Sequence, residues 1–471
     1  MHEPRPDEAP RGVLAGVRVA DFSRVLAGPY TTMMLADFGA DVVKIEPPTG
    51  DDTRHWAPPV DANGQATYFG SVNRNKRSVA LDLNDAADLA EAQRLAATAD
   101  VVIENFRPGV MARFGLAFDD VHAVNPGAVY CSITGFGTGE GAALAGYDLL
   151  VQAVGGLMSI TGASDGEPAK AGVALVDVLT GQNALAGILL ALRERDRTGA
   201  GQLVEVNLVQ SMLSALTNQA ASTLATGTAP KRLGNAHPSI APYAVFHAAD
   251  RELVIAVGND KQFRALAAVL GADLDTRHPS SGATRSAGVS PPSSGATRSA
   301  GVSPPSSGAT RSAGVSPPSS GATRSAGVSP SSSGATRSAG ESVSSGATRS
   351  AGFDDARFAT NAERVAHRAE LTALIEQCLA GASADHWVAA LTEVGVPAGL
   401  VNDVGEAIAF AGGLGLDPVA EIPAATHVSR TIANPIRLTT DPAAYRTPPP
   451  ALDEHSGADW LETSARRKEP R

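Results

Sequence analysis

The chain has 471 residues, of which 43% are hydrophobic and 18% charged, and its formal net charge is −11 at pH 7. A chain of this length is too long to fold around one compact core, so we predict two domains. The composition is typical of a globular enzyme. The negative charge argues against a nucleic-acid-binding face, which needs a dense basic surface.

The N-terminus is polar and broken by proline, without the apolar stretch of a signal peptide. We find no uninterrupted apolar run of membrane-spanning length, so we expect no membrane association. Cys131 and Cys378 lack metal-site spacing and are interpreted as buried thiols in a reducing compartment. We therefore expect a cytoplasmic protein.

The first part of the chain alternates strand and helix patterns. We expect strands at 17–22, 41–46, 78–83, 100–104, 128–134 and 203–208, and helices at 28–38, 85–97, 182–195 and 208–222. Gly28-Pro29 begins the first helix and Gly39 ends it, as proline and glycine commonly do. Strands connected by helices run parallel, so this order predicts an α/β fold with helices on both faces of a parallel sheet.

A second region begins near residue 231. Segments 241–247 and 252–257 are typical of a hairpin, and helices are expected at 261–270, 361–380 and 383–394. Thr360 and Glu363 form a capping box for the helix at 361–380. These elements predict a smaller α+β domain over residues 226–400, after a flexible N-terminus at 1–12 and a large domain at 13–225.

An internal repeat interrupts the smaller domain. The sequence Ser-Ser-Gly-Ala-Thr-Arg-Ser-Ala-Gly occurs six times, beginning at Ser280, Ser293, Ser306, Ser319, Ser332 and Ser344. Each copy offers little apolar surface for stacking, so ordering it would cost more free energy than its burial returns. We expect residues 278–352 to form a disordered insert in a loop; a binding tract with one arginine per copy is the alternative.

Several blocks of sequence resemble the class III CoA transferases, the CaiB–BaiF family. They are 23–29 (SRVLAGP), 35–46 (LADFGADVVKIE), 73–78 (NRNKRS), 104–109 (ENFRPG), 146–153 (GYDLLVQA), 177–181 (DVLTG) and 234–238 (GNAHP). The resemblance implies a Rossmann-like large domain that is completed by the C-terminal segment 401–471, with the smaller domain inserted in it. It also implies an intertwined homodimer that acts on an acyl-CoA and a carboxylic acid, with coenzyme A as a substrate and no permanently bound cofactor or metal.

The same resemblance assigns residues to the reaction. Asp177 matches the nucleophilic aspartate, and Arg24, Lys76 and Arg113 match contacts to coenzyme A. Arg74 and Arg77 extend the basic run around Lys76, which we expect just before a strand. A solvated charged turn is the alternative for this run, because cations of this kind also occur on ordinary surface turns.

The residue types around Asp177 suit covalent catalysis. A carboxylate can attack a thioester carbonyl because thiolate is a good leaving group; the product is a mixed anhydride on the enzyme. We expect Asp177 just before a helix opened by Thr180-Gly181, where the field of a helix N-terminus favours an ionised acid and free N–H groups can bind an oxyanion. A simple helix N-cap is the alternative for Asp177.

Tyr147 favours transfer over the related racemisation of 2-methylacyl-CoA. The α-methylacyl-CoA racemases resemble the block around Tyr147-Asp148 but carry histidine before the aspartate, because they need a base to move an α-proton. A tyrosine with an ordinary pKa near ~10 is a poor base at neutral pH, so we assign Tyr147 to positioning the thioester. A racemase, or an acyl-CoA-binding homologue without activity, remains the alternative. Leu26 stands where the formyl-CoA/oxalate branch has glutamine, which argues against oxalate as the acceptor.

Overall fold

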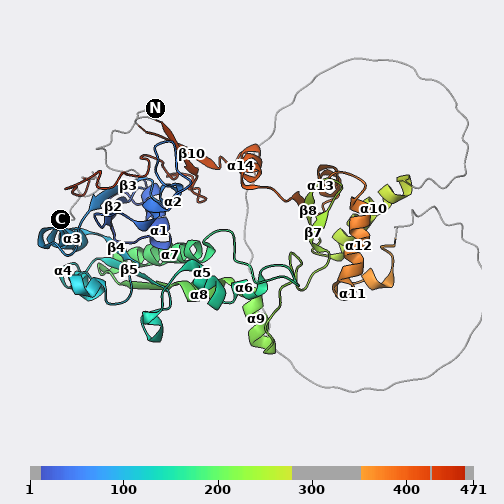
Figure 1. Cartoon of the computed structure of the whole chain (residues 1–471), viewed down its shortest axis with the longest axis horizontal. Coiled ribbons are helices and arrows are strands. Elements are labelled where there is room, and N and C mark those ends of the chain that lie inside the picture. The colour runs from blue at the N-terminus through green and yellow to red at the C-terminus, as the bar shows by residue number, and fades with distance from the viewer. Residues whose placement is uncertain (1–11, 278–351, 425–426, 462–471) are drawn as a thin grey trace, which may run out of the picture.

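The computed structural model describes residues 12–277, 352–424 and 427–461, and these form two units with separate hydrophobic cores (Figure 1). The larger unit contains all the strands of the N-terminal half, and the smaller one is built around a second core. The flexible N-terminus predicted at 1–12 and the disordered insert predicted at 278–352 lie outside the described residues, apart from their last residues.

The large unit contains a six-stranded parallel sheet, which confirms the predicted α/β class. The strand order is β3-β2-β1-β4-β5-β6. The strands are β1 (Arg18–Asp21), β2 (Asp41–Glu46), β3 (Lys76–Ala80), β4 (Val101–Glu104), β5 (Val129–Thr134) and β6 (Leu203–Asn207). The direction of winding reverses between β1 and β4, and sheets of this kind bind ligands beyond the carboxyl ends of the strands at such a point.

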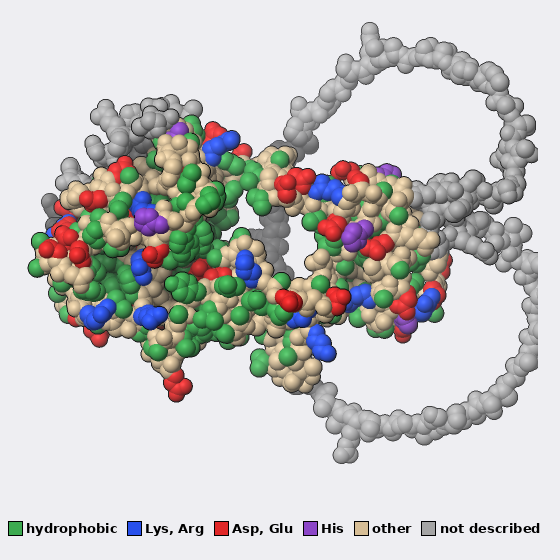
Figure 2. Space-filling model, viewed as in Figure 1, with side chains coloured by type: hydrophobic (Ala, Val, Ile, Leu, Met, Phe, Trp, Pro, Cys, Tyr) green, Lys and Arg blue, Asp and Glu red, His purple; other side chains and the backbone are tan. Residues whose placement is uncertain are grey.

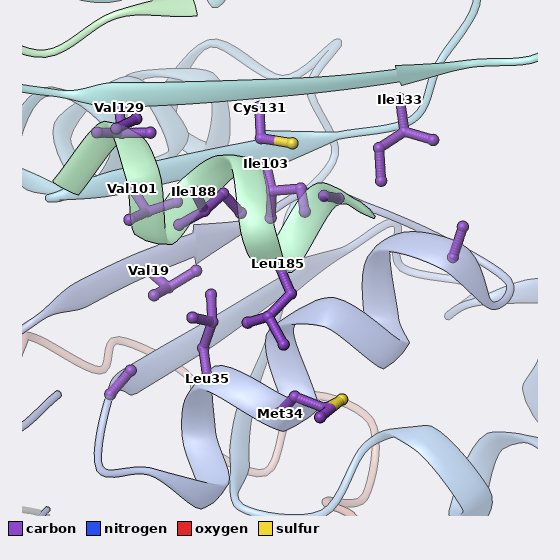
Figure 3. Close-up of a cluster of buried hydrophobic side chains, with 14 of the residues drawn as sticks. Val19, Met34, Leu35, Val101, Ile103, Val129, Cys131, Ile133, Leu185 and Ile188 are labelled. Carbon is purple, nitrogen blue, oxygen red and sulfur yellow. The ribbon is translucent and has the colours of Figure 1, made fainter. Parts of the chain in front are cut away.

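Helices cover both faces of the sheet. Helices α1 (Ala27–Asp37) and α7 (Leu175–Thr198) lie on one face, and α3 (Ala86–Thr98) and α4 (Phe118–Val124) on the other. Successive strand residues alternate between the two cores: Val19 and Ile103 belong to the first core, which Figure 3 shows, and Ala20 and Val102 belong to the second. A Cβ at Gly181 would lie 2.7 Å from the carbonyl oxygen of Ala27, so this glycine lets α7 approach α1 closely.

Three predicted elements of the large unit differ from the structure by more than one residue. Helix α7 begins at Leu175 rather than at 182, and strand β3 begins at Lys76 rather than at 78. The helix predicted at 208–222 is two helices, α8 (Leu208–Ala215) and α9 (Thr217–Thr226), with Thr217 at a φ of 40°. Shorter helices complete the unit: η1 (Asp52–His55), α2 (Thr67–Val72), η2 (Met111–Phe114), η3 (Glu140–Ala143), α5 (Asp148–Val154) and α6 (Leu157–Ile160).

Helix α7 is long and apolar enough to cross a membrane by length and composition alone, although Asp177, Gln182 and Asn183 interrupt its apolar residues. Of the apolar window that passes this test, 44% is buried inside the protein. Ile188 and Leu192 pack into the core beneath the sheet. The composition of α7 is thus accounted for by packing on one side, while its other side stays exposed.

The smaller unit is an antiparallel three-stranded sheet with helices packed against it. The strands are β7 (Tyr243–His247), β8 (Glu252–Ala256) and β9 (Ala398–Leu400), and β9 joins the predicted hairpin at its β8 edge. The helices are α10 (Asp260–Arg277), η4 (Ala356–Phe358), α11 (Asn361–Ala366), α12 (Arg368–Leu379) and α13 (Ala384–Glu393). The predicted helix 361–380 is therefore interrupted at His367.

The C-terminal segment lies against the large unit. After α14 (Val404–Gly413) and the hairpin of β10 (Val419–Pro423) and β11 (Val428–Ile432), the chain follows the outer edge of β3. The backbone N–H of His455 donates to the carbonyl of Ser78 at 3.0 Å, and Asn75 donates to Thr447 at 3.0 Å. These bonds cover an edge strand that would otherwise expose unpaired backbone groups.

Candidate active site

A cavity of about 310 Å³ lies beyond the carboxyl ends of β1, β4 and β5. Its walls come from the loop after β1, the turn after β4 and the first residues of α5 and α7. This is the crevice expected where the strand order reverses. Among the predicted site residues, the cavity brings together Asp177, Tyr147 and Arg24.

Asp177 was predicted to lie just before a helix, but it is the third residue of α7. The N-cap is Ala174, whose side chain makes no capping bond, so the alternative that Asp177 is a simple N-cap is wrong. Among the described residues, no donor bonds to the Asp177 carboxylate, and the residue is partly buried. Burial, followed by the negative charge of Asp148, raises the pKa of Asp177 to about 7.

Asp148 occupies the N-terminus of α7 in place of Asp177. Its Oδ1 accepts the backbone N–H groups of Val176 at 2.8 Å and Asp177 at 3.2 Å. Its Oδ2 accepts from Gln152 Nε2 at 2.6 Å, and Gln152 Oε1 accepts from the N–H of Ala171 at 2.8 Å. The helix N–H groups expected to stabilise an ionised Asp177 are thus bonded to a neighbouring carboxylate.

The loop after β1 is fixed from several sides. The Asn105 side chain accepts from the Arg24 N–H at 2.8 Å and donates to the Arg24 carbonyl at 2.7 Å. The next residue, Val25, has a φ of 68°, a conformation that β-branched residues rarely adopt. Its N–H donates to the buried Asp51 carboxylate at 3.2 Å, and Asp51 pairs with buried Lys44 at 2.9 Å. Such strain persists only where the surroundings hold it.

Two tyrosines lie near the carboxylates. Tyr147 lines the cavity at the start of α5 with 64% of its surface exposed, a position open to a substrate. Tyr68, on α2, was not singled out from the sequence. Burial and then the charges of Asp177 and Asp148 raise the pKa of Tyr68 to about 12, so its hydroxyl remains a neutral donor. No sequence signal identified Tyr68, because it reaches the site only through the fold.

The basic run at 74–77 does not line the cavity, contrary to the predicted phosphate contacts. The Lys76 ammonium is fully buried and donates to Asp21 at 3.1 Å and to two further internal oxygens. Arg74 pairs with Asp37 and Arg77 with Asp41, at 2.6 and 2.7 Å. Because β3 begins at Lys76, the run lies at the amino end of its strand, whereas the cavity opens at carboxyl ends.

Two other arginines flank the cavity. Arg107, in the turn after β4, is exposed and lines both the main cavity and a smaller adjoining one of about 50 Å³. Residues 104–109 were identified by their resemblance to the family, but no role was predicted for Arg107. Arg113 is exposed on η2 and stands outside the cavity wall, one turn beyond Val110, which belongs to it.

The chemistry available at this site is that of carboxylates and guanidinium groups. In the described part of the chain, no cluster of three or more His, Cys, Asp or Glu side chains has the arrangement of a metal site. The cavity is large enough for an acyl group and a thioester but too small for a whole coenzyme A. A carboxylate with a pKa near neutrality, set beside arginines that can bind anions, suits acyl transfer on a thioester whose nucleotide extends out of the cavity.

Comparison with known proteins places the chain in a family. Residues 14–288 and 345–456 match the family described as CoA-transferase family III. A succinate–glutarate CoA-transferase of Agrobacterium fabrum is 38% identical over 94% of this chain and 93% of its own length. A succinyl-CoA:glutarate CoA-transferase of Mus musculus is 46% identical over 55% of this chain and 59% of its own length.

Solved structures agree with this placement. The crystal structure of a CaiB/BaiF family protein from Brucella suis superimposes with a TM-score of 0.71 and 36% identity, covering 94% of this chain and 97% of that one. A protein of Mycobacterium tuberculosis gives the same TM-score at 26% identity and covers 95% of this chain. The chain therefore belongs to CoA-transferase family III, the CaiB–BaiF family, and is an enzyme of acyl-CoA:carboxylate CoA transfer.

Proposed function

We propose that this enzyme moves CoA between two dicarboxylic acids and that Asp177 is its nucleophile. The observation that carries the proposal is the Asp177 carboxylate, which lines the cavity without a hydrogen-bond donor among the described residues. The substrate class is supported by relatives that are named for succinate and glutarate, for mesaconate and for citramalate. Another relative is named for oxalate, but the apolar Leu26 in the cavity wall favours a longer acid here.

The proposed reaction has four steps that return the enzyme to its starting state. Asp177 attacks the thioester carbonyl of the donor, forming a mixed anhydride and releasing the CoA thiolate. The thiolate attacks the aspartyl carbonyl, which gives an Asp177–CoA thioester and frees the donor acid. The acceptor carboxylate attacks this thioester and again releases thiolate. The thiolate then attacks the acyl carbonyl of the new anhydride, so that the product acyl-CoA leaves and the Asp177 carboxylate is restored.

The protonation state of Asp177 controls the first step, because only the ionised carboxylate is nucleophilic. With a pKa of about 7, about half of the enzyme carries the ionised form at neutral pH. The high pKa also makes the ionised group a stronger nucleophile than an ordinary carboxylate. Tyr147, exposed in the same cavity, is placed to position the thioester rather than to remove a proton.

The phosphates of coenzyme A need cations, and we propose Arg107, in the cavity wall, and Arg113, outside it, for this role. Both are exposed, and neither makes an ion pair among the described residues. They replace the run at 74–77, whose side chains are occupied by internal partners. Arg107→Gln should raise the KM for acyl-CoA with little change in kcat, since a phosphate contact acts on binding. An unchanged KM would discard the contact.

An intertwined homodimer remains a proposal, supported by apolar side chains on the surface of the large unit. Figure 2 shows them gathered over α5, α7 and α8. At least half of the surface of each of four such residues is exposed: Leu149, Val154, Leu190 and Leu213. Single chains rarely leave such a surface uncovered. A second copy of this chain is the partner we expect.

Trapping the covalent intermediate tests the central claim. Incubation with succinyl-CoA and hydroxylamine should convert the Asp177 side chain to a hydroxamate, detected by mass spectrometry of its peptide. The Asp177→Asn variant, which cannot form an anhydride, is the control. If α-deuterium enters a 2-methylacyl-CoA while residue 177 never carries an adduct, the enzyme is a racemase instead.

A further inference from the structure

Arg24 has the features of an anion site within the cavity. Its Nε is buried and has no hydrogen-bond partner in the part of the chain that the structure describes, although the guanidinium as a whole is partly exposed. The guanidinium lies over the Phe106 ring, with 5.0 Å between its Cζ and the ring centroid. Such stacking holds the plane of an arginine while leaving its edge free for a carboxylate.

The backbone that carries Arg24 is held rigid. The Asn105 side chain binds both its N–H and its carbonyl, at 2.8 and 2.7 Å, and the strained Val25 follows directly. A side chain on so fixed a loop loses little entropy when it binds a ligand. Strain at a position that lines a substrate cavity is typical of a functional constraint.

The partner of Arg24 is weakly held. Asp52 approaches Nη1 of Arg24 at 3.5 Å, at the limit of a hydrogen bond, and its side chain is 57% exposed. Exposed pairs of this kind contribute little free energy. By contrast, the buried pairs of the same unit, such as Arg74 with Asp37, lie at 2.6 Å. A ligand carboxylate can therefore displace Asp52 from Arg24 at small cost.

The charge of the cavity requires such a cation. Among the described residues, its wall carries the carboxyl groups of Asp52, Asp148 and Asp177, the last about half ionised at neutral pH, against the guanidinium groups of Arg24 and Arg107. A monocarboxylic acyl group brings no further charge once it is joined to CoA, whereas a dicarboxylic one keeps its distal carboxylate. That carboxylate would meet a net negative wall unless one arginine bound it directly.

We infer that Arg24 binds the distal carboxylate of a dicarboxylic acyl group, and that Asp52 is the counter-ion which this carboxylate displaces. The inference rests on the proposed function and assigns within it the residue that selects dicarboxylic over monocarboxylic acids. It differs from the predicted contact between Arg24 and coenzyme A. Phosphate binding would affect every acyl-CoA alike, whereas distal-carboxylate binding affects only dicarboxylic substrates.

Titration calorimetry with saturating free CoA tests the inference on the full-length enzyme. Glutarate and pentanoate have the same number of carbons but differ in the second carboxylate. Arg24→Gln should weaken glutarate binding about 10- to 100-fold, the range expected for a charged hydrogen-bonded contact. It should leave the Kd values of pentanoate and CoA within about twofold of wild type, the small effect expected where no charged contact is lost.

Asp52→Asn provides a test of opposite sign. Removing the competing charge should tighten glutarate binding about 2- to 5-fold, and the gain should vanish in the Arg24→Gln background if Asp52 acts through Arg24. Arg357→Gln, which breaks the exposed pair of Arg357 with Asp355 at 2.8 Å in the smaller unit, is the matched control and should change none of these constants.

Three results would overturn the inference: equal losses for glutarate and pentanoate, a loss of CoA affinity in Arg24→Gln, or tighter wild-type binding of pentanoate than of glutarate. These results are independent of turnover. If glutarate binds through Arg24 but label never exchanges between succinyl-CoA and glutarate, the proposed function fails and the binding site stands. If label does exchange but Arg24→Gln binds glutarate as tightly as wild type, the inference about Arg24 fails and the proposed function stands.

Discussion

Replacing Asp177 by asparagine should abolish transfer and, at the same time, stabilise the folded enzyme at alkaline pH. The fold raises the pKa of Asp177 from 3.8 to about 7, so it binds this proton more tightly than the unfolded chain does. Each unit of difference between the folded and unfolded pKa values corresponds to about 1.4 kcal/mol. The folded state is therefore penalised progressively as pH rises from about 4 to about 7, and above that range the penalty is on the order of 4 kcal/mol.

Asparagine has nearly the same shape and never ionises, so the variant escapes this penalty. Its stability advantage over wild type should grow by on the order of 3 kcal/mol between pH 5 and pH 8. Parallel urea unfolding of wild type and Asp177→Asn at the two pH values measures the difference. A variant that is less stable than wild type at pH 8, or an advantage that does not depend on pH, would refute the claim that the fold holds an unfavourable carboxylate here.

Other substitutions test the surroundings of the nucleophile. Asp148→Asn keeps an acceptor for the α7 N–H groups but removes the negative charge beside Asp177, which should lower the pKa of Asp177. The acidic limb of the profile of kcat/KM against pH should therefore move to lower pH. A limb that stays in place would contradict the coupling between the two carboxyl groups. Lys76→Met removes the ion-pair partner of buried Asp21, which keeps only the more distant charge of Lys44, and should cost about 3–5 kcal/mol in urea unfolding, with an unchanged KM for acyl-CoA. A raised KM would restore Lys76 as a coenzyme contact. Leu190→Asp places a charge on the exposed apolar side of α7 and should convert the proposed dimer to monomers, measured by light scattering after gel filtration. An unchanged dimer mass would exclude this face from the proposed interface.

The sheet could be predicted from the sequence because its signals are local. The strand at 41–46, for example, carries Val42, Val43 and Ile45 between Gly39 and Pro47, and it follows a helix of clear start and end. The α7 boundary was misjudged because Leu175 and Val176 carry no capping residue before them. The cap comes from Asp148, 28 residues earlier in the chain, and only the tertiary structure brings it there.

The site was predicted in part, and the errors have a common cause. Asp177, Tyr147 and Arg24 line one cavity as expected, because each follows a strand or begins a helix near the switch point. Lys76 lies away from the cavity because β3 begins two residues earlier than predicted, which places Lys76 in a buried strand instead of an exposed turn. Charge runs in sequence give no sign of which residues meet internal partners, since those partners lie elsewhere in the chain.

The arrangement at α7 explains how an aspartate at a helix N-terminus can have a high rather than a low pKa. Helix N-termini normally lower the pKa of an acid through their free N–H groups and their dipole. Here Asp148 accepts the N–H groups of Val176 and Asp177, and Gln152 holds it in place. Asp177 is left with desolvation and a neighbouring negative charge, and both raise its pKa. The same feature that weakens the fold leaves the Asp177 oxygens without a hydrogen-bond donor from any described residue, and a carboxylate without such bonds is the better nucleophile toward a thioester.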